Sequence, residues 1–454
     1  MKLSVVRYPV AVLLLLASVS LVRADVVLDW NRVASDVLRD NLSLQNPGMA
    51  SRSLAMMNLA IYDAFAMTTP GDTMFFNYGG GHQSPGMTAD YKAAAAQAAY
   101  TVLSGIYDDQ YATLNGALSA SLSAVPDSAA KTEGIAMGAM IGHSILAERA
   151  SDGYDSLSQY LPTDEPGHWQ SDPINPGQEA WGPAWGEVTP FALASNRQFM
   201  PGRMPALTSK AYADAFNEVK ELGAADSTTR TAEQTEIGNF WAYDRAGMGT
   251  PHRLFGDVLQ TIAAQQANTP KENAELFAKA TVAMADAGVV AWNSKFQYDF
   301  WRPVTGIREA DLDGNPLTEA DPDWTPLGAP GGDGNNNFTP PFPTYVSGHA
   351  TFGGALFGVL QEFYGTDDIA FTLASEEMPG VLRDYDSFSE AMAENGRSRV
   401  YLGIHWNFDD TVGQQLGLRV ADYLFNRPFV TAVPEPSALG LAALAALGMA
   451  GRRR

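Results

Sequence analysis

Histidine, arginine and aspartate stand in a pattern suited to chemistry near the C-terminus. Arg399 precedes His405 by six residues, and Asp409 follows it by four. If this stretch is helical, His405 and Asp409 share a face, so the carboxylate can hold one ring nitrogen and leave the other free. A histidine prepared in this way can act as a nucleophile or as a ligand of an oxyanion. The alternative is a solvated histidine at the start of a helix.

A second histidine follows a proline-rich loop at residues 340–343. The apolar stretch that begins near His349 predicts a helix, which places Ser347 and Gly348 at its N-terminus. Free N–H groups and the helix dipole favour an anion at this position. His349 would then act on that anion as a proton donor. The alternative is an ordinary serine N-cap with a histidine in the first turn.

Two cations precede these segments. Lys295 and Arg302 are seven residues apart, so two turns of one helix would place both on the same face, with Pro303 ending the helix. Like charges on one face repel each other unless an anion lies between them. The neighbouring aromatic residues Phe300 and Trp301 argue against the alternative, a solvated basic edge. Together the three segments offer a complete shell for a tetrahedral oxyanion: Lys295, Arg302, Ser347, Gly348, His349, Arg399 and His405.

The three segments resemble the Lys-x6-Arg-Pro, Pro-Ser-Gly-His and Ser-Arg-x5-His-x3-Asp signature shared by vanadium-dependent haloperoxidases and the type 2 phosphatidic acid phosphatase superfamily. Order and spacing match, and Val346 stands where the motif usually has proline. The resemblance implies a helical bundle with the oxyanion site in its core. Lys295, Arg302 and Arg399 would bind the equatorial oxygens of the oxyanion. Ser347 and Gly348 would assist them.

The same resemblance implies the cofactor and the catalytic roles. His405 would be the covalent ligand of vanadate, the metal-binding position, and Asp409 would orient it. In a phosphatase the same histidine would be the nucleophile, since phosphate can occupy a vanadate site. His349 would be the acid–base group, and Lys295 would also polarise bound hydrogen peroxide. The expected products are hypohalous acids, formed from halide and peroxide.

Three features favour a haloperoxidase over a phosphatase. Soluble acid phosphatases of the superfamily are much shorter, whereas haloperoxidases carry an extra helical bundle before the lysine. Trp292 and Phe342 also resemble the residues that line the halide site of fungal chloroperoxidases. Asp244 resembles the aspartate that pairs with an active-site arginine in that family. The alternatives are an acid phosphatase working through a phosphohistidine and a non-catalytic surface protein.

Composition limits the partners of the chain. The formal net charge is −22, so the chain has no basic face for nucleic acid, and its acidic surface resists anionic membranes. An anionic ligand must therefore be captured by a local cationic pocket. The absence of cysteine excludes disulfides, thiol nucleophiles and thiolate metal sites.

Apolar periodicity predicts an all-α protein with helices packed in bundles. The resemblance implies two packed helical bundles, with the oxyanion site in the core of the C-terminal one. His143 is expected to be partly buried. Aspartates between 311 and 323 suggest calcium, but their glycine spacing does not fit an EF-hand loop, which favours a solvated turn. Long loops are expected at 153–204 and 308–341. Helices are predicted at 51–67, 89–122, 132–150, 209–222, 232–243, 251–266 and 271–300.

Both ends of the chain resemble targeting signals. Residues 1–24 read as a secretory signal peptide cleaved after Ala24. Residues 433–454 combine a Pro-Glu-Pro turn, a short apolar run and a basic tail, which resembles the PEP-CTERM sorting signal of Gram-negative bacteria. That signal is processed by a membrane protease, which implies a secreted protein at the cell surface or outside the cell. Between the two signals we predict an N-terminal bundle at 25–205, which includes an aromatic loop, and a C-terminal bundle at 206–432.

Overall fold

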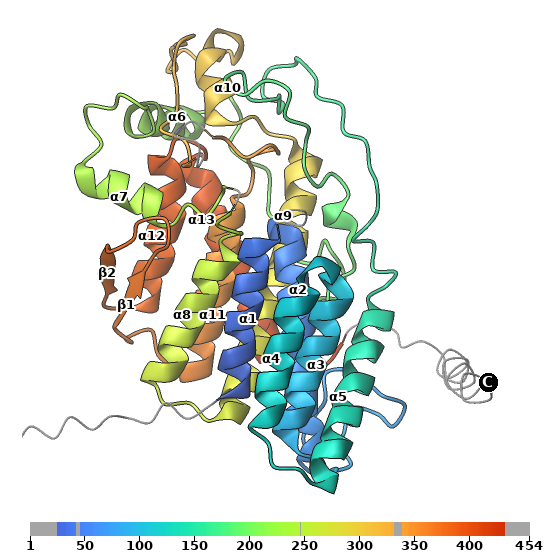
Figure 1. Ribbon diagram of the computed structural model, residues 1–454. Coiled ribbons are helices and arrows are strands. Elements are labelled where there is room, and N and C mark those ends of the chain that lie inside the picture. The colour runs from blue at the N-terminus through green and yellow to red at the C-terminus, as the bar shows by residue number, and fades with distance from the viewer. Residues whose placement is uncertain (1–24, 42–45, 246, 331–337, 432–454) are drawn as a thin grey trace, which may run out of the picture.

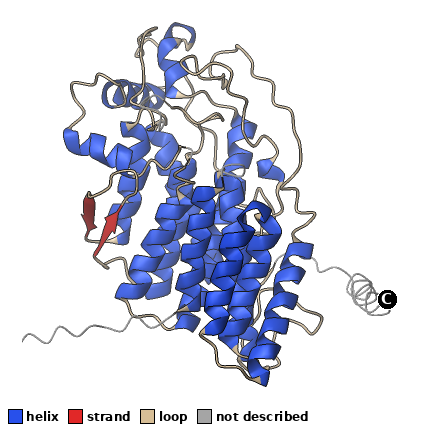
Figure 2. Ribbon diagram, viewed as in Figure 1, coloured by secondary structure: helices blue, strands red, loops and turns tan. Residues whose placement is uncertain are grey.

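A computed structural model describes residues 25–41, 46–245, 247–330 and 338–431. The predicted signal peptide and sorting signal therefore lie outside the described residues. Figure 2 shows a protein built mainly of helices, with one small hairpin of strands, which confirms the all-α prediction. None of the helices within the described ranges is long and apolar enough to cross a membrane.

The helices and strands follow one another along the chain in this order: α1 (Val26–Asp40), α2 (Pro47–Thr68), α3 (Tyr91–Ile106), α4 (Tyr111–Ser123), α5 (Ala129–Glu148), α6 (Lys210–Leu222), α7 (Ala232–Phe240), α8 (His252–Gln265), α9 (Pro270–Tyr298), α10 (Pro303–Arg308), α11 (Gly348–Tyr364), β1 (Phe371–Ala374), β2 (Leu382–Tyr385), α12 (Phe388–Tyr401) and α13 (Asn407–Phe425). The strands β1 and β2 pair in an antiparallel hairpin.

The N-terminal bundle consists of α1 to α5, in which α3 packs against α2, α4 and α5 (Figure 1). The contact between α3 and α5 is unusually close because small residues line both helices. A Cβ atom added at Gly138 of α5 would lie 2.2 Å from the backbone oxygen of Ala94 in α3. The alanine-rich sequence of α3 therefore serves backbone-to-backbone packing as well as helix propensity.

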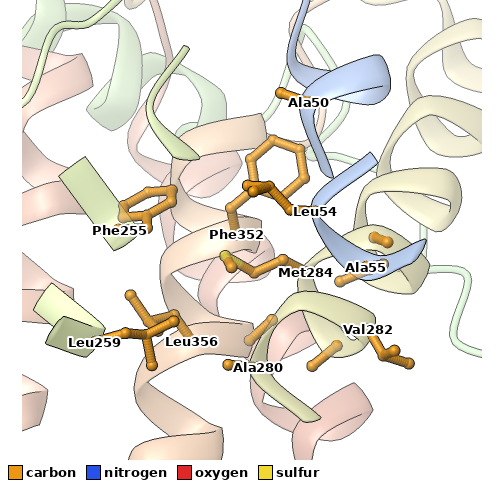
Figure 3. Close-up of a cluster of buried hydrophobic side chains, with 14 of the residues drawn as sticks. Ala50, Leu54, Ala55, Phe255, Leu259, Ala280, Val282, Met284, Phe352 and Leu356 are labelled. Carbon is orange, nitrogen blue, oxygen red and sulfur yellow. The ribbon is translucent and has the colours of Figure 1, made fainter. Parts of the chain in front are cut away.

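The long helix α9 joins the two bundles, because it packs against α2 and also against α11 and α13. Its start is fixed by a capping box between Thr269 and Glu272, with Pro270 at the first helical position. Figure 3 shows this region, where Leu54 of α2, Met284 of α9 and Phe352 of α11 form part of one buried apolar cluster. The site described below is thus supported by a continuous core.

The aromatic loop at 153–204 is held on this core by a buried carboxylate of α9. Asp286 accepts hydrogen bonds from the backbone N–H groups of Phe191, Ala192 and Leu193 at 2.6, 2.8 and 2.9 Å. A carboxylate that accepts three N–H groups is a strong anchor for a segment without regular structure. The sequence prediction of an ordered loop here is confirmed.

Two local predictions were wrong. The helix expected over 89–122 is divided, because Tyr107 leaves the helical backbone and buries its side chain, whose hydroxyl bonds Ser53 at 2.7 Å. His143 is exposed on α5, because the face that packs on α3 carries the glycines Gly138 and Gly142 instead.

Candidate active site

Five helix ends of the C-terminal bundle meet around one cluster of charged side chains. Lys295 lies near the end of α9, Arg302 precedes α10, and His349 lies in the first turn of α11. Arg399 lies near the end of α12, and His405 precedes α13. All five side chains are buried. The structure therefore brings together the three segments that the sequence analysis singled out.

Lys295 and Arg302 converge by a different route from the one predicted. Helix α9 ends at Tyr298, and Asp299 adopts a left-handed conformation with φ 53°. Arg302 is the N-cap of α10, so Pro303 begins a helix rather than ending one. The expectation of two cations on one helical face was wrong. The two residues are instead brought together by the sharp turn between α9 and α10.

The proline-rich loop at 340–346 surrounds the lysine with carbonyl oxygens. The Nζ atom of Lys295 donates to the backbone oxygens of Pro343, Thr344 and Val346 at 3.0, 2.9 and 2.6 Å. Burial, and then the charge of Arg302, hold the pKa of Lys295 well below its usual range. Three carbonyl acceptors nevertheless match the three N–H groups of an ammonium, so this arrangement favours the charged form and fixes it next to the site.

His405 contacts Asp409, although not through the helical geometry that was expected. His405 lies two residues before α13, and Asp409 lies in its first turn, where Oδ2 accepts from the backbone N–H of Trp406 at 3.1 Å. The same oxygen lies 2.9 Å from Nδ1 of His405. The spacing of four residues thus reflects a helix cap that also holds the imidazole ring.

The two ring nitrogens of His405 have different partners, which sets the tautomer. Nε2 lies 3.0 Å from Nη1 of Arg302, and a guanidinium group can only donate. Nε2 therefore carries the lone pair, and Nδ1 carries the proton that faces Asp409. Burial and the charge of Arg302 lower the pKa of His405 well below its usual value, which keeps the ring neutral. A neutral Nε2 is the form that can bind a metal centre.

Asp409 has a pKa raised to about 7 by burial, opposed by the Thr344 hydroxyl and the charge of Lys295. Thr344 is a site residue that the sequence analysis missed. Its hydroxyl lies 2.5 Å from Oδ2 of Asp409 and 3.0 Å from Nδ1 of His405. Its place directly after the Pro-Phe-Pro run was the one available signal, and a threonine in a loop carries little information by itself.

His349 lies at the N-terminal end of α11, with Ser347 as the N-cap and Gly348 as the first residue. Its Nε2 atom lies 2.9 Å from the oxygen of Ala242 and 3.1 Å from that of Trp241. Because carbonyls only accept, Nε2 carries the proton, and Nδ1 is the nitrogen that can take one up. Burial and the charge of Arg399 lower the pKa of His349 to about 4.

Arg399 forms an ion pair with Asp244, whose Oδ2 lies 2.5 Å from Nη2. The remaining nitrogens of Arg399, Nε and Nη1, are buried without a hydrogen-bond partner, and Nη2 of Arg302 is in the same condition. Buried donors without acceptors are costly, so each such group in a folded protein calls for an explanation. These orphaned guanidinium nitrogens fit an oxyanion, whose oxygens would accept from them.

A cavity of about 230 Å³ opens onto this cluster. His349, Arg399 and His405 line it, together with Asp244 and Gly348. Trp292 and Phe342, the residues expected at a halide site, also line the cavity. The Nζ atom of Lys295 lies 4.9 Å from the ring centre of Phe342 and 5.6 Å from that of Trp292. The indole Nε1 of Trp292 is buried without a partner.

Within the described ranges, no group of three or more His, Cys, Asp or Glu side chains is placed to hold a metal cation. Of the aspartates between 311 and 323, Asp313 is buried and closes a turn. Asp313 accepts from the backbone N–H of Asn315 at 2.6 Å and from the hydroxyl of Thr318 at 2.7 Å. These bonds close the turn as Asx-type contacts.

Models of known protein families match both halves of the chain, and one of them covers the site residues from Lys295 to Asp409. The vanadium chloroperoxidase N-terminal domain matches residues 20–179, the VCPO second helical-bundle domain matches 275–430, and the PEP-CTERM protein-sorting motif matches 432–454. A vanadium chloroperoxidase of Curvularia inaequalis is 32% identical over 86% of this chain and 80% of its own length.

Two solved structures share the fold. The first bacterial vanadium-dependent iodoperoxidase to be solved superimposes with a TM-score of 0.73 at 25% identity, over 87% of this chain and 94% of its own. A holo bacterial vanadium-dependent chloroperoxidase gives a TM-score of 0.65 at 15% identity, over 86% and 95% of the two chains. The second likeness concerns the fold alone.

Proposed function

This chain belongs to the vanadium-dependent haloperoxidase family, and on that premise we propose how its own residues hold vanadate and oxidise halide with hydrogen peroxide. The observation that carries the proposal is the set of buried guanidinium nitrogens without partners, on Arg302 and Arg399. Arg399 lines the same cavity as His405, and Nη1 of Arg302 lies 3.0 Å from Nε2 of His405, whose lone pair it would yield to an incoming ligand. A tetrahedral oxyanion bound to that nitrogen would satisfy them.

The charges of the cage also suit an anion. Lys295, Arg302 and Arg399 supply three buried cations, whereas the carboxylates of Asp244 and Asp409 are each engaged with a site residue. This local excess of positive charge opposes the net charge of −22 carried by the whole chain. Bound vanadate would supply a Lewis acid that activates hydrogen peroxide for attack by halide.

Each residue then has a physical task. His405 offers the lone pair of Nε2, while Asp409 and Thr344 keep the proton on Nδ1. The two arginines neutralise oxyanion charge, and Ser347 and Gly348 place the N-terminus of α11 at the site. The Lys295 ammonium adds a third charge that would polarise bound peroxide. Halide would enter along Trp292 and Phe342, which line the cavity.

His349 serves as the acid–base group in this proposal. The ring lines the cavity and is held by the two carbonyls that fix its Nε2–H. Burial and Arg399 lower its pKa to about 4, so the ring is neutral near neutral pH and Nδ1 holds a lone pair. The negative charge of a bound oxyanion would raise this pKa and make Nδ1 a stronger base toward incoming peroxide. The same proton can later be returned to an oxygen that leaves.

The phosphatase alternative uses the same cage, because phosphate and vanadate share shape and charge. The matches to vanadium chloroperoxidase domains in both halves of the chain favour the haloperoxidase. The test is reconstitution of purified protein with vanadate, followed by peroxide, bromide and a phenolic dye. We expect vanadate-dependent bromination. Hydrolysis of p-nitrophenyl phosphate without vanadate-dependent bromination would contradict the proposal.

The match to the PEP-CTERM motif indicates export and sorting to the cell surface in bacteria. We propose that the host is Gram-negative, that residues 1–24 are a cleaved signal peptide, and that a membrane protease processes the C-terminal signal. We also propose that residues 25–205 and 206–432 form the two structural units of the mature enzyme. Cell fractionation with an antibody to the folded part would test the surface location.

A further inference from the structure

The cavity above the cage is larger and more apolar than an oxyanion and a halide require. Its volume is about 230 Å³, whereas an apolar cavity of about 150 Å³ already accepts benzene. Aromatic and proline side chains form most of its lining, including Trp181, Pro341 and Phe352. Among the described residues that line it, the charged ones are Arg399 and Asp244, which pair with each other. These two residues belong to the cage, and the lining away from the cage offers planar apolar surface without a charged side chain.

Trp181 is placed over this cavity by specific contacts. Its backbone N–H donates to the oxygen of Pro341 at 2.8 Å, which ties the aromatic loop to the rim of the site. The next residue, Gly182, has φ +76°, and a Cβ atom there would lie 2.8 Å from Nε1 of Trp292. Glycine therefore permits both the left-handed turn and the close approach of the loop to the tryptophan beneath it.

The ring of Trp181 meets those of Trp292 and Phe342 edge to face. The Trp181 and Trp292 ring centres are 5.3 Å apart with an angle of 84° between the planes, and the Trp181 and Phe342 centres are 6.3 Å apart at 67°. Trp181 remains only partly buried, so part of its ring is still available to a ligand. Such a surface recognises another aromatic ring by offset or edge contacts.

We propose that this cavity also binds the organic acceptor of the halogen, and that the acceptor is a neutral, electron-rich planar aromatic compound such as a phenol or an indole, held against Trp181. The inference rests on the proposed function. In the overall reaction a ring C–H bond breaks and a carbon–halogen bond forms. Halide loses two electrons to hydrogen peroxide. The two peroxide oxygens leave as two water molecules, whose four hydrogens come from the peroxide itself, the ring C–H and one proton from solution. Holding the ring beside the cage fixes which ring carbon reacts.

Binding can be tested without turnover. Indole is titrated into vanadate-free protein and its binding is followed by saturation-transfer difference NMR. We expect Trp181→Ala to weaken binding roughly tenfold and Trp181→Phe to weaken it less, because part of the aromatic contact remains. The matched control is Leu161→Ala, since Leu161 belongs to the same loop and is 73% exposed outside the cavity. Thermal unfolding of each variant reports whether the fold is retained.

A product analysis then links binding to chemistry. Vanadate-loaded protein brominates indole with bromide and peroxide, and the isomer ratio is compared with that from hypobromous acid in buffer. The proposal predicts different ratios, and a shift toward the reagent ratio in Trp181→Ala. Equal indole affinities of wild type and a folded Trp181→Ala variant would overturn it, and so would identical ratios. Indole binding without any vanadate-dependent bromide oxidation would instead reject the function proposed for the cage.

Discussion

Replacing Thr344 by valine tests how the vanadate ligand is positioned. The side chain is fully buried, and its hydroxyl lies 2.5 Å from Oδ2 of Asp409 and 3.0 Å from Nδ1 of His405. Valine has nearly the same shape but cannot donate. A hydrogen bond to a charged group contributes about 1.5–3 kcal/mol to stability, so we expect a loss of that size in the free energy of unfolding.

The effect on vanadate binding follows from the same contacts. Without the hydroxyl, Asp409 loses a group that lowers its pKa, so more of it is protonated at neutral pH and its hold on His405 Nδ1 weakens. Groups that orient a metal-bound histidine typically affect metal affinity by about 10- to 100-fold. We therefore expect vanadate to bind Thr344→Val weaker by that factor in isothermal titration calorimetry.

Thr344→Ser is the matched control, because it keeps the hydroxyl and removes one methyl group. It should lose about 0.5–1.5 kcal/mol of stability, as for removal of one buried methyl elsewhere, and retain its vanadate affinity. If Thr344→Val binds vanadate as tightly as Thr344→Ser, the hydroxyl does not position His405 and the reasoning is refuted.

Three further predictions concern the scaffold, each measured by urea unfolding. Gly417→Ala should destabilise the protein by about 1–2 kcal/mol, because its Cβ atom would lie 2.3 Å from backbone atoms of α11, and this overpacking outweighs the gain in helix propensity. The control is Gly116→Ala, which should stabilise the protein because nothing lies within 4 Å of its Cβ position. Equal effects of the two substitutions would contradict the packing argument. Asp286→Ala should lower the free energy of unfolding by about 3 kcal/mol or more, because three backbone N–H groups lose their acceptor. It should also expose the aromatic loop to protease. An unchanged cleavage pattern would show that the loop has another anchor. Burial raises the pKa of Asp257 from 3.8 to about 6, so the folded protein favours the protonated carboxyl group. The stability that this protonated group contributes is present near pH 4 and is lost as the pH rises through 6. Asp257→Asn should therefore gain about 1–2 kcal/mol relative to wild type between pH 4 and pH 8, and a pH-independent difference would reject that pKa.

The sequence singled out charged and histidine side chains that the structure brings together, each at or near a helix end. It predicted their geometry less well. The spacing between His405 and Asp409 suits one helical face, but it equally suits an N-terminal cap, and the structure has the cap. Proline after Arg302 likewise fits the end of one helix or the start of the next, and α10 begins there. Local spacing alone does not separate these cases.

Other features depend on distant parts of the chain and left little trace in the sequence. Thr344 acquires its role only when the loop before α11 meets α13. Trp181 reaches the cavity because the aromatic loop crosses from the N-terminal bundle to the rim of the site. The break after α3 did carry a signal, since the aspartates at 108 and 109 favour a turn, but the surrounding alanine-rich pattern concealed it.

The central claim is that His405 binds vanadate within a cage of buried cations. The direct measurement is vanadium content, by elemental analysis after vanadate loading and removal of unbound vanadate, on wild type and His405→Ala. The account predicts one vanadium per wild-type chain, together with vanadate-dependent bromination, and loss of both in a folded His405→Ala variant. Stoichiometric vanadium and full bromination activity in the His405→Ala variant would contradict it, as would a wild-type protein that retains no vanadium.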